Sequence, residues 1–369
     1  MQPDRLIVTR SAQARARIFA AMDVASSPAG EPGFDAGGPT LGETGESELL
    51  RRLTEIARGT TGQGVRLGSG DDGGVWRPPP GVEVVMSQDA LVEGKDFQRG
   101  WLTPRRLGGR ALRVALSDLA GMGATPAWCT ATLCAPASTS LGDVLEIQRG
   151  LCEAAAAAGC ALIGGDVSDI DGPLVIDVCA AGSVAEGRFL RRDAGRAGDV
   201  LVVTGRLGRA AAGLRLLLGA APPAARRDEV AWRSALLDPV VRLAEGQALV
   251  EAGVRCGGDM SDGLLAEAER TGAASGCGVE LWLEAVPVDE ALAGVFGDAW
   301  QELALGGGED FELLFALEPE ALATLRSRWA GRAPLTVVGR LGAGAGVRLL
   351  QGEGGVELPL PAVRSRHYG

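Results

Sequence analysis

The stretch from Leu67 to Phe97 constrains the fold more than any other part of the chain. It predicts a strand, an acidic turn and a second strand, with Asp71 and Asp72 among four glycines in the turn. The second strand leaves the apolar run 84–86 and ends in Ser-Gln-Asp at residues 87–89. Carboxylates at a strand end suit Mg²⁺, which usually binds through a few carboxylates plus substrate phosphates, and glycine lets the backbone approach a phosphate closely. The alternative is two acidic hairpin turns, because Asp-Gly is a common turn signal.

Two scarce residue types argue against whole classes of active site. The single histidine, His367, lies two residues from the C-terminus, which argues against a Ser-His-Asp triad or a histidine-ligated zinc site. The single lysine, Lys95, does not stand in the phosphate-loop pattern, since Asp89 occupies the first glycine position and Asp96 follows the lysine. The lysine set of protein kinases is equally absent.

Net charge and cysteine usage narrow the range of partners. The chain has 369 residues, enough for two or three domains, and a net charge of −11. This charge argues against nucleic acid or an anionic membrane as the main partner, and a polyphosphate substrate would need to arrive with metal ions. Seven dispersed cysteines without a C-x-x-C pair indicate a reduced, cytoplasmic protein. Because aromatic residues make up only 4%, we expect Ala, Val and Leu to fill the core.

Helix and strand patterns alternate through the first half of the chain. Residues 1–40 are expected to form a flexible extension without a convincing secretory signal, and an α/β domain is expected over 41–185. Apolar spacing predicts its helices and strands: helices at 45–58, 104–121 and 141–158, and strands at 128–135, 160–165 and 174–182. Asp118 falls within the second helix, where an aspartate is rarely buried unless it is paired or bound to metal. Exposure on the other helix face is the alternative.

A second α/β domain is expected over 186–358, followed by a tail at 359–369. Its predicted elements are strands at 199–205 and 335–340, helices at 209–218 and 240–252, a Pro/Arg-rich loop at 219–229, and a helix beginning at Leu264. Ser261 or Asp262 is the expected N-cap of that last helix, whose N-terminus suits an anion. Glu309 and Asp310 lie in a Gly-rich turn before a further strand. We expect no transmembrane span and no short-period repeat.

Acidic residues beside glycine or serine recur at the ends of these elements. Several carboxylates holding two or more Mg²⁺ ions could clamp a triphosphate and neutralise charge during phosphoryl transfer. The series consists of Asp71, Asp72, Asp89, Asp118, Asp166, Asp259, Asp262, Glu309 and Asp310.

Seven motifs, in order, resemble those of the thiamine-monophosphate kinase family: GDDGGV, SQDALVEG, ALSDLAGMGA, LIGGD, VVTGRLG, SDGLLAE and GGEDFELLF. This family belongs to the superfamily of aminoimidazole-ribonucleotide synthetase and selenophosphate synthetase, and the resemblance covers about residues 42–342. It implies a two-domain, mixed α/β fold, a homodimer formed through the N-terminal sheet, and a cleft for ATP and several Mg²⁺ ions. It also implies direct in-line phosphorylation of thiamine monophosphate to thiamine diphosphate.

The resemblance implies roles for individual residues. Those at metal-binding positions are Asp72, Ser87, Gln88, Asp89, Asp118, Asp166, Asp259 and Asp262. Those at nucleotide-contacting positions are Gly165, Asp166, Arg192 and Ser261. Arg192 also suits phosphate because a guanidinium binds it bidentately, although a solvated basic turn is the alternative. Glu309 stands at a substrate-contacting position.

Three positions depart from the family pattern. Gln88 replaces the usual threonine, which ligates through its hydroxyl or backbone. Asp96 replaces a histidine that contacts substrate in the family, and the tail 359–369 lacks a tryptophan that the family usually has. The last two changes fall on the substrate side, so they leave another acceptor open. A related ATP-dependent enzyme with a different acceptor, and a dimeric ATP-binding module without turnover, are the alternative functions.

No histidine base is required by the expected chemistry. A phosphate monoester has a second pKa of about 6, so it is already a dianion at pH 7. Catalysis then reduces to alignment and charge neutralisation, which carboxylate-held Mg²⁺ and an arginine can supply.

Overall fold

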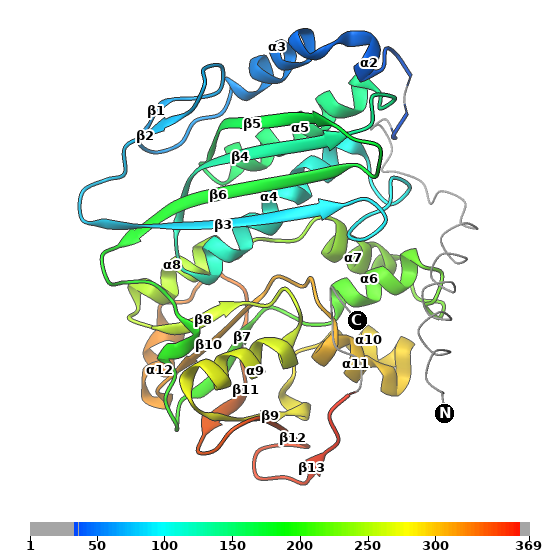
Figure 1. The fold of residues 1–369 in the computed structure, drawn as a ribbon. Helices are drawn as coiled ribbons and strands as arrows, with labels where there is room; N and C mark the ends of the chain where they lie inside the picture. Colours follow the sequence, from blue (N-terminus) through cyan, green and yellow to red (C-terminus); the bar gives the residue numbers. More distant parts are fainter. Residues whose placement is uncertain (1–32, 36, 362–369) are drawn as a thin grey trace, which may run out of the picture.

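The computed structural model describes residues 33–35 and 37–361. The expectations for most of the N-terminal extension, and for His367 and nearly all of the tail, fall outside the described residues. Within them the chain forms two lobes, each built around its own sheet (Figure 1). The mixed α/β, two-lobe fold expected from the sequence is confirmed.

The N-terminal lobe contains a four-stranded sheet in the order β3-β6-β4-β5. Helices α4 and α5 lie behind this sheet (Figure 1). The elements of the lobe are α2 (Leu41–Thr44), α3 (Glu46–Ala57), β1 (Val65–Leu67), β2 (Val75–Trp76), β3 (Val82–Val92), α4 (Pro104–Gly121), β4 (Thr125–Ala135), α5 (Leu141–Ala157), β5 (Ala161–Asp169) and β6 (Val175–Ala185).

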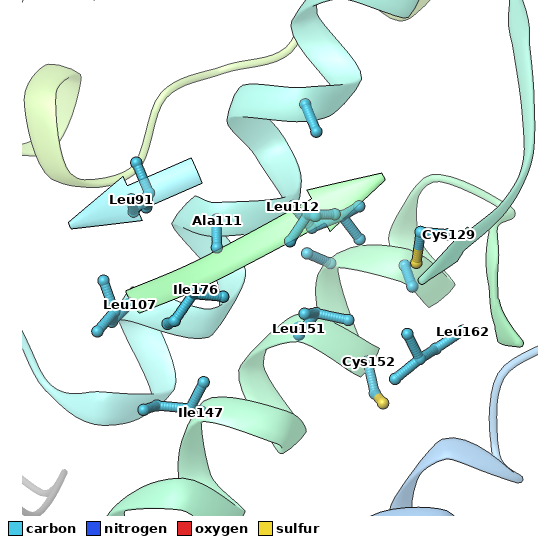
Figure 2. Close-up of a cluster of buried hydrophobic side chains, with 14 of the residues drawn as sticks. Leu91, Leu107, Ala111, Leu112, Cys129, Ile147, Leu151, Cys152, Leu162 and Ile176 are labelled. Atoms are coloured by element: carbon cyan, nitrogen blue, oxygen red, sulfur yellow. The ribbon is translucent and has the colours of Figure 1, made fainter. Parts of the chain in front are cut away.

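Helix α4 begins where the sequence specifies a start. Thr103 accepts a hydrogen bond from the N–H of Arg106, and Pro104 occupies the first turn, where its missing N–H is not needed. Helices α4 and α5 then cross closely, because a Cβ at Gly108 would lie 1.8 Å from the carbonyl oxygen of Ile147. Leucine, isoleucine, alanine and cysteine side chains fill the space between these helices and the sheet (Figure 2).

The opposite face of the four-stranded sheet exposes apolar side chains. Val84 is 48% exposed and Met86 is 60% exposed on β3. Strands β3 and β5 are the two edges of the sheet, so among the described residues neither has a partner on its outer side. Both an apolar face and two unpaired edges are therefore available to another chain.

The C-terminal lobe contains a seven-stranded sheet in the order β13-β12-β9-β11-β7-β10-β8. Its strands are β7 (Val200–Thr204), β8 (Cys256–Asp259), β9 (Gly278–Trp282), β10 (Leu313–Leu317), β11 (Leu335–Gly342), β12 (Val347–Leu350) and β13 (Glu357–Leu358). Its helices are α6 (Arg209–Leu217), α7 (Arg226–Leu237), α8 (Leu243–Glu251), α9 (Leu264–Ser275), α10 (Glu290–Phe296), α11 (Trp300–Gly306) and α12 (Pro319–Ser327). Short 3₁₀ turns are η1 (Arg192–Ala194), η2 (Leu283–Ala285) and η3 (Gly297–Ala299).

The end of α4 touches the C-terminal lobe directly. A Cβ at Gly121 would lie 2.6 Å from the backbone nitrogen of Asp259, and one at Gly246 would lie 2.0 Å from the carbonyl oxygen of Ala120. Glycine at both positions therefore allows α4 to approach β8 and α8 at backbone distance.

Two expectations about the C-terminal lobe were wrong. The predicted loop at 219–229 ends early, because α7 begins at Arg226 and buries Trp232 completely. The N-cap of α9 is Gly263, at φ 91°, and not Ser261 or Asp262. Gly263 is required because a Cβ there would lie 2.5 Å from the carbonyl oxygen of Gly307.

Neither a disulfide nor a membrane-spanning helix is found among the described residues. All seven cysteines are free thiols, and five of them are buried. No helix in the described ranges combines the length and apolar character needed to cross a membrane.

Candidate active site

A network of polar side chains joins the two lobes at the C-terminal end of α4. Ser87 on β3 donates its hydroxyl to Oδ2 of Asp118. The neighbouring Ser117 donates its hydroxyl to Oδ2 of Asp259 at 2.8 Å. Three of the residues expected to bind metal, which are far apart in the sequence, thus meet here.

The electrostatics around Asp259 favour a bound cation. Asp259 is only 3% exposed, and burial, with a further contribution from the Asp118 carboxylate, raises its pKa to about 7. The negative charges of the two carboxylates repel each other, and a cation that binds both removes this repulsion. Within residues 33–35 and 37–361, no three histidine, cysteine or acidic side chains already form a metal cage. This arrangement fits Mg²⁺, which binds through one or two carboxylates and completes its shell with water and substrate phosphates.

A series of ion pairs between α9 and the 3₁₀ turn η1 also reaches Asp259. Arg192 Nε donates to Oε1 of Glu267 at 2.5 Å, and its NH2 lies 3.7 Å from Oδ1 of Asp259. Arg270 donates to Oδ2 of Asp262 and lies 3.6 Å from Oε2 of Glu267. The Glu267 carboxylate is therefore fixed between two arginines, and Arg192 is held beside Asp259.

Gly258 makes this arrangement possible. A Cβ at Gly258 would lie 2.6 Å from Oε1 of Glu267 and 3.0 Å from NH2 of Arg192. A side chain there would push apart the ion pair that positions Arg192.

The loop between α11 and β10 lies next to the start of α9. The N–H of Glu309 donates to the carbonyl oxygen of Ser261 at 2.8 Å, and Oε1 of Glu309 accepts from NH2 of Arg110 at 2.8 Å. The Asp310 carboxylate accepts from the N–H groups of Gly208 at 2.6 Å and Ala210 at 2.8 Å. Glu309 is thereby held by both lobes.

Three of the expected site residues belong to a different part of the N-terminal lobe. Asp72 lies in the exposed loop between β1 and β2, and Gly165 and Asp166 lie on edge strand β5. Gly165 and Asp166 line a cavity of about 360 Å³ together with the loop residue Asp71 and apolar side chains of α3 and α5. Within one chain, and among the described residues, Asp166 therefore makes no contact with Asp118 or Asp259.

Residues 87–89 lie in the middle of β3, which continues to Val92 and does not end at Asp89 as expected, and these residues differ in direction. Successive strand residues point to opposite faces, and the exposed Gln88 donates its amide to Oδ2 of Asp177 at 2.6 Å on the open face of the sheet. Ser87 and Asp89 are half-buried on the side of α4. Only the backbone of Gln88 is therefore placed for a metal on that side. Asp96, in the turn after β3, accepts a hydrogen bond from the N–H of Val92 at 2.8 Å.

Four residues of the network were missed by the sequence reasoning: Arg110, Ser117, Glu267 and Arg270. Local signals existed for three of them. Ser117 adjoins Asp118, and the spacing of Glu267 and Arg270 places them on one helix face. The contacts of Arg110 with Glu309 span 199 positions, so no local pattern indicates them.

Comparison with known proteins agrees with this architecture. Residues 70–184 match the model for the N-terminal domain of AIR synthase related proteins, and residues 196–351 match the model for their C-terminal domain. The two lobes and the site between them therefore define a two-domain AIR synthase related protein.

More specific relatives come from curated sequences and solved structures. A thiamine-monophosphate kinase from Synechococcus elongatus is 36% identical over 287 residues, which cover 76% of this chain and 84% of that protein. The crystal structure of thiamine-monophosphate kinase from Stenotrophomonas maltophilia is 35% identical, with a TM-score of 0.72 over 82% of this chain and 95% of that one. The structure described as AaThiL complexed with AMPPCP and TMP is 27% identical, with a TM-score of 0.69 over 90% of this chain and 100% of that one. The chain belongs to the thiamine-monophosphate kinase family.

Proposed function

We propose that this protein transfers the terminal phosphoryl group of ATP to thiamine monophosphate and forms thiamine diphosphate. The observation that supports this most directly is the interlobe contact of Asp118, Ser117 and Asp259, with Arg192 at its edge. The relatives named thiamine-monophosphate kinase, and the related structure complexed with AMPPCP and TMP, supply the substrates for the proposal.

The chemistry follows from the side chains. Mg²⁺ bound by Asp118 and Asp259, together with Ser87, Asp89 and the other metal-site residues expected from the sequence, would neutralise charge on the transferring phosphoryl group. Arg192, fixed by Glu267, offers a guanidinium that can bind a phosphate through two hydrogen bonds. The acceptor phosphate needs no base, because it is already a dianion at neutral pH.

The cavity beside Gly165 and Asp166 is our proposed seat for the adenine and ribose of ATP. Its volume of about 360 Å³ and its apolar lining from Leu53, Leu151 and Leu162 suit a flat heterocycle. A Cβ at Gly165 would lie 2.0 Å from the carbonyl oxygen of Ala131, so glycine keeps β4 and β5 in close contact at the mouth of this cavity.

We propose a homodimer that joins the two halves of the site. Strands β6 and β4 separate β3 from β5, so Asp89 and Asp166 lie on strands about 14 Å apart in one sheet. A second copy with its β5 alongside β3 would bring Asp166 of that copy towards Asp89. Two-fold symmetry would pair the other edges in the same way and cover Val84 and Met86.

Glu309 and Asp96 are the proposed acceptor-side residues. The Glu309 side chain is 36% exposed beside Ser261, where its carboxylate can attract the positive thiazolium ring. Asp96 adds a second negative charge and replaces the histidine of the family pattern, so we expect a raised KM for thiamine monophosphate. We also propose a cytoplasmic location, which rests on the seven free cysteines.

ADP release with and without thiamine monophosphate tests the function. We expect release that depends on thiamine monophosphate and Mg²⁺, with thiamine diphosphate detected by mass spectrometry. ADP release stimulated only by another phosphorylated acceptor would favour a related enzyme of the same superfamily. ATP binding without turnover for any acceptor would favour a non-catalytic ATP-binding module.

A further inference from the structure

We infer that Arg110 is a positioning residue for the acceptor: it fixes the carboxylate of Glu309 and links acceptor recognition to α4, the helix that carries Asp118 in its last turn. This inference rests on the proposed function. Arg110 does not stand in any of the motifs that indicated the site, and it does not itself face the solvent.

The burial of Arg110 shows that its position is tightly determined. Its side chain is 1% exposed, and a buried guanidinium is costly unless its donors are satisfied. NH1 donates to the carbonyl oxygen of Leu236 at the end of α7, and NH2 donates to Oε1 of Glu309 at 2.8 Å. This guanidinium thus connects three segments: α4, the end of α7 and the loop between α11 and β10.

The backbone of Glu309 is also tightly determined. Its φ is 70°, in the left-handed region that non-glycine residues rarely adopt. The neighbouring Gly308 has no room for a side chain, since a Cβ would lie 2.4 Å from the carbonyl oxygen of Ser261. The loop is therefore pressed against the start of α9, and Arg110 holds the Glu309 carboxylate at its other end.

Arg110 occupies only one oxygen of that carboxylate. Oε1 accepts from Arg110, whereas Oε2 forms no hydrogen bond with any residue that the structure describes. With 36% of the side chain exposed, the second oxygen is the one that a cationic or hydrogen-bonding acceptor can use. Arg110 thus holds the carboxylate by one side and leaves the other side for the ligand.

The same face of α4 makes both contacts with the C-terminal lobe. Arg110 and Ser117 are seven residues apart, which places them on one helix face, about 10 Å apart along the axis. Arg110 contacts Glu309 and Ser117 contacts Asp259. One rigid helix therefore aligns the proposed acceptor contact with the proposed metal contact.

The test compares Arg110 with a neighbour on the same helix. Arg106 lies one turn earlier and binds Asp238, just beyond α7, with Nε at 3.0 Å from Oδ2, so Arg106→Lys is the matched control. Lysine keeps the positive charge but lacks the planar guanidinium, whose NH1 and NH2 groups donate to two different acceptors. We expect Arg110→Lys to raise KM and Kd for thiamine monophosphate about tenfold, as for loss of one charge-assisted hydrogen bond. The Kd for ATP should change less than about twofold in both variants.

A double variant separates positioning from general loss of structure. If Arg110 acts through Glu309, Arg110→Lys combined with Glu309→Gln should weaken thiamine monophosphate binding no more than Glu309→Gln alone. Additive losses, an equal loss in Arg106→Lys, or an unchanged Kd in Arg110→Lys would each overturn the inference while leaving the proposed function in place. Calorimetry on the wild type reports on the proposed function: absence of thiamine monophosphate binding would overturn it, and the inference with it.

Discussion

The hydroxyl of Ser117 donates to Oδ2 of Asp259 across 2.8 Å, and so joins α4 of the N-terminal lobe to β8 of the C-terminal lobe. Both residues are almost fully buried. Together with Arg192, whose NH2 lies 3.7 Å from Oδ1, this hydrogen bond fixes the orientation of the Asp259 carboxylate between the lobes.

Replacing Ser117 by alanine tests this orienting role. Residues that orient metal-binding carboxylates typically contribute tenfold to a hundredfold in metal affinity. We expect Ser117→Ala to raise the Mg²⁺ concentration for half-maximal ADP release by about tenfold, with turnover recovering at high Mg²⁺. An unchanged Mg²⁺ dependence would show that Asp259 is held without Ser117.

The metal-site carboxylates should be essential for turnover. Asp89→Asn and Asp118→Asn are each expected to lower kcat at least about a hundredfold, because no histidine or phosphate-loop lysine can replace them. Thermal melting should show folded proteins. Glu357→Gln, which removes an exposed carboxylate on β13, is the control and should behave as the wild type. Near-wild-type rates of both aspartate variants at low Mg²⁺ would contradict the assignment.

The role of Asp96 can be separated into charge and hydrogen bonding. Asp96→His restores the family residue and should lower KM for thiamine monophosphate. Asp96→Asn keeps an oxygen that can accept from the N–H of Val92 while it removes the charge. Steady-state kinetics of both variants decides the matter: a wild-type KM in the low micromolar range that histidine makes worse would show that Asp96 already serves this substrate.

Met86 should report on the dimer. It is 60% exposed on the uncovered face of the four-stranded sheet, where a second copy would bury it. We expect wild-type protein to sediment as a dimer at micromolar concentration and Met86→Glu to shift towards monomer, because a buried unpaired charge is costly. A monomeric wild type would refute the dimer.

Stability of the ligand-free protein should fall as pH rises through the titration range of Asp310. Burial raises the pKa of Asp310 to about 7, against the opposing effect of the N–H groups of Ala210 and Gly208. Because the folded state holds the proton more tightly than the unfolded state, this contribution is complete below about pH 4 and is lost towards pH 7. Asp310→Asn should therefore give a flatter dependence of Tm on pH between 5 and 8. Parallel curves for the two proteins would rule this out.

Local sequence signals predicted much of the fold. The bounds of α4 follow from Thr103, Pro104 and its apolar spacing, and the predicted helix matches residues 104–121. Helix α7 was missed because prolines and arginines dominate the local pattern, whereas burial of Trp232 against distant segments stabilises the helix.

The candidate site was predictable as a list of carboxylates but not as a set of contacts. Ser117 and Asp259 are 142 positions apart, and their pairing depends on how the lobes meet. The direction of Gln88 was open to prediction, since neighbours on a strand face opposite sides. The separation of Asp166 from Asp89 could not be foreseen, because it depends on the order of strands in the sheet.

The close crossing of α4 and α5 has a consequence for how this scaffold can evolve. A Cβ at Gly108 or Gly150 would lie within 1.8 Å of a carbonyl oxygen on the opposing helix, so α4 has no room to slide along its neighbour. The spacing between its two interlobe contacts, Arg110 and Ser117, is set by the helix itself at about 10 Å. We therefore expect a change of acceptor to arise from substitutions at the proposed acceptor-side residues, in the loop around Glu309 and at Asp96, while the proposed metal-binding end of α4 stays constant.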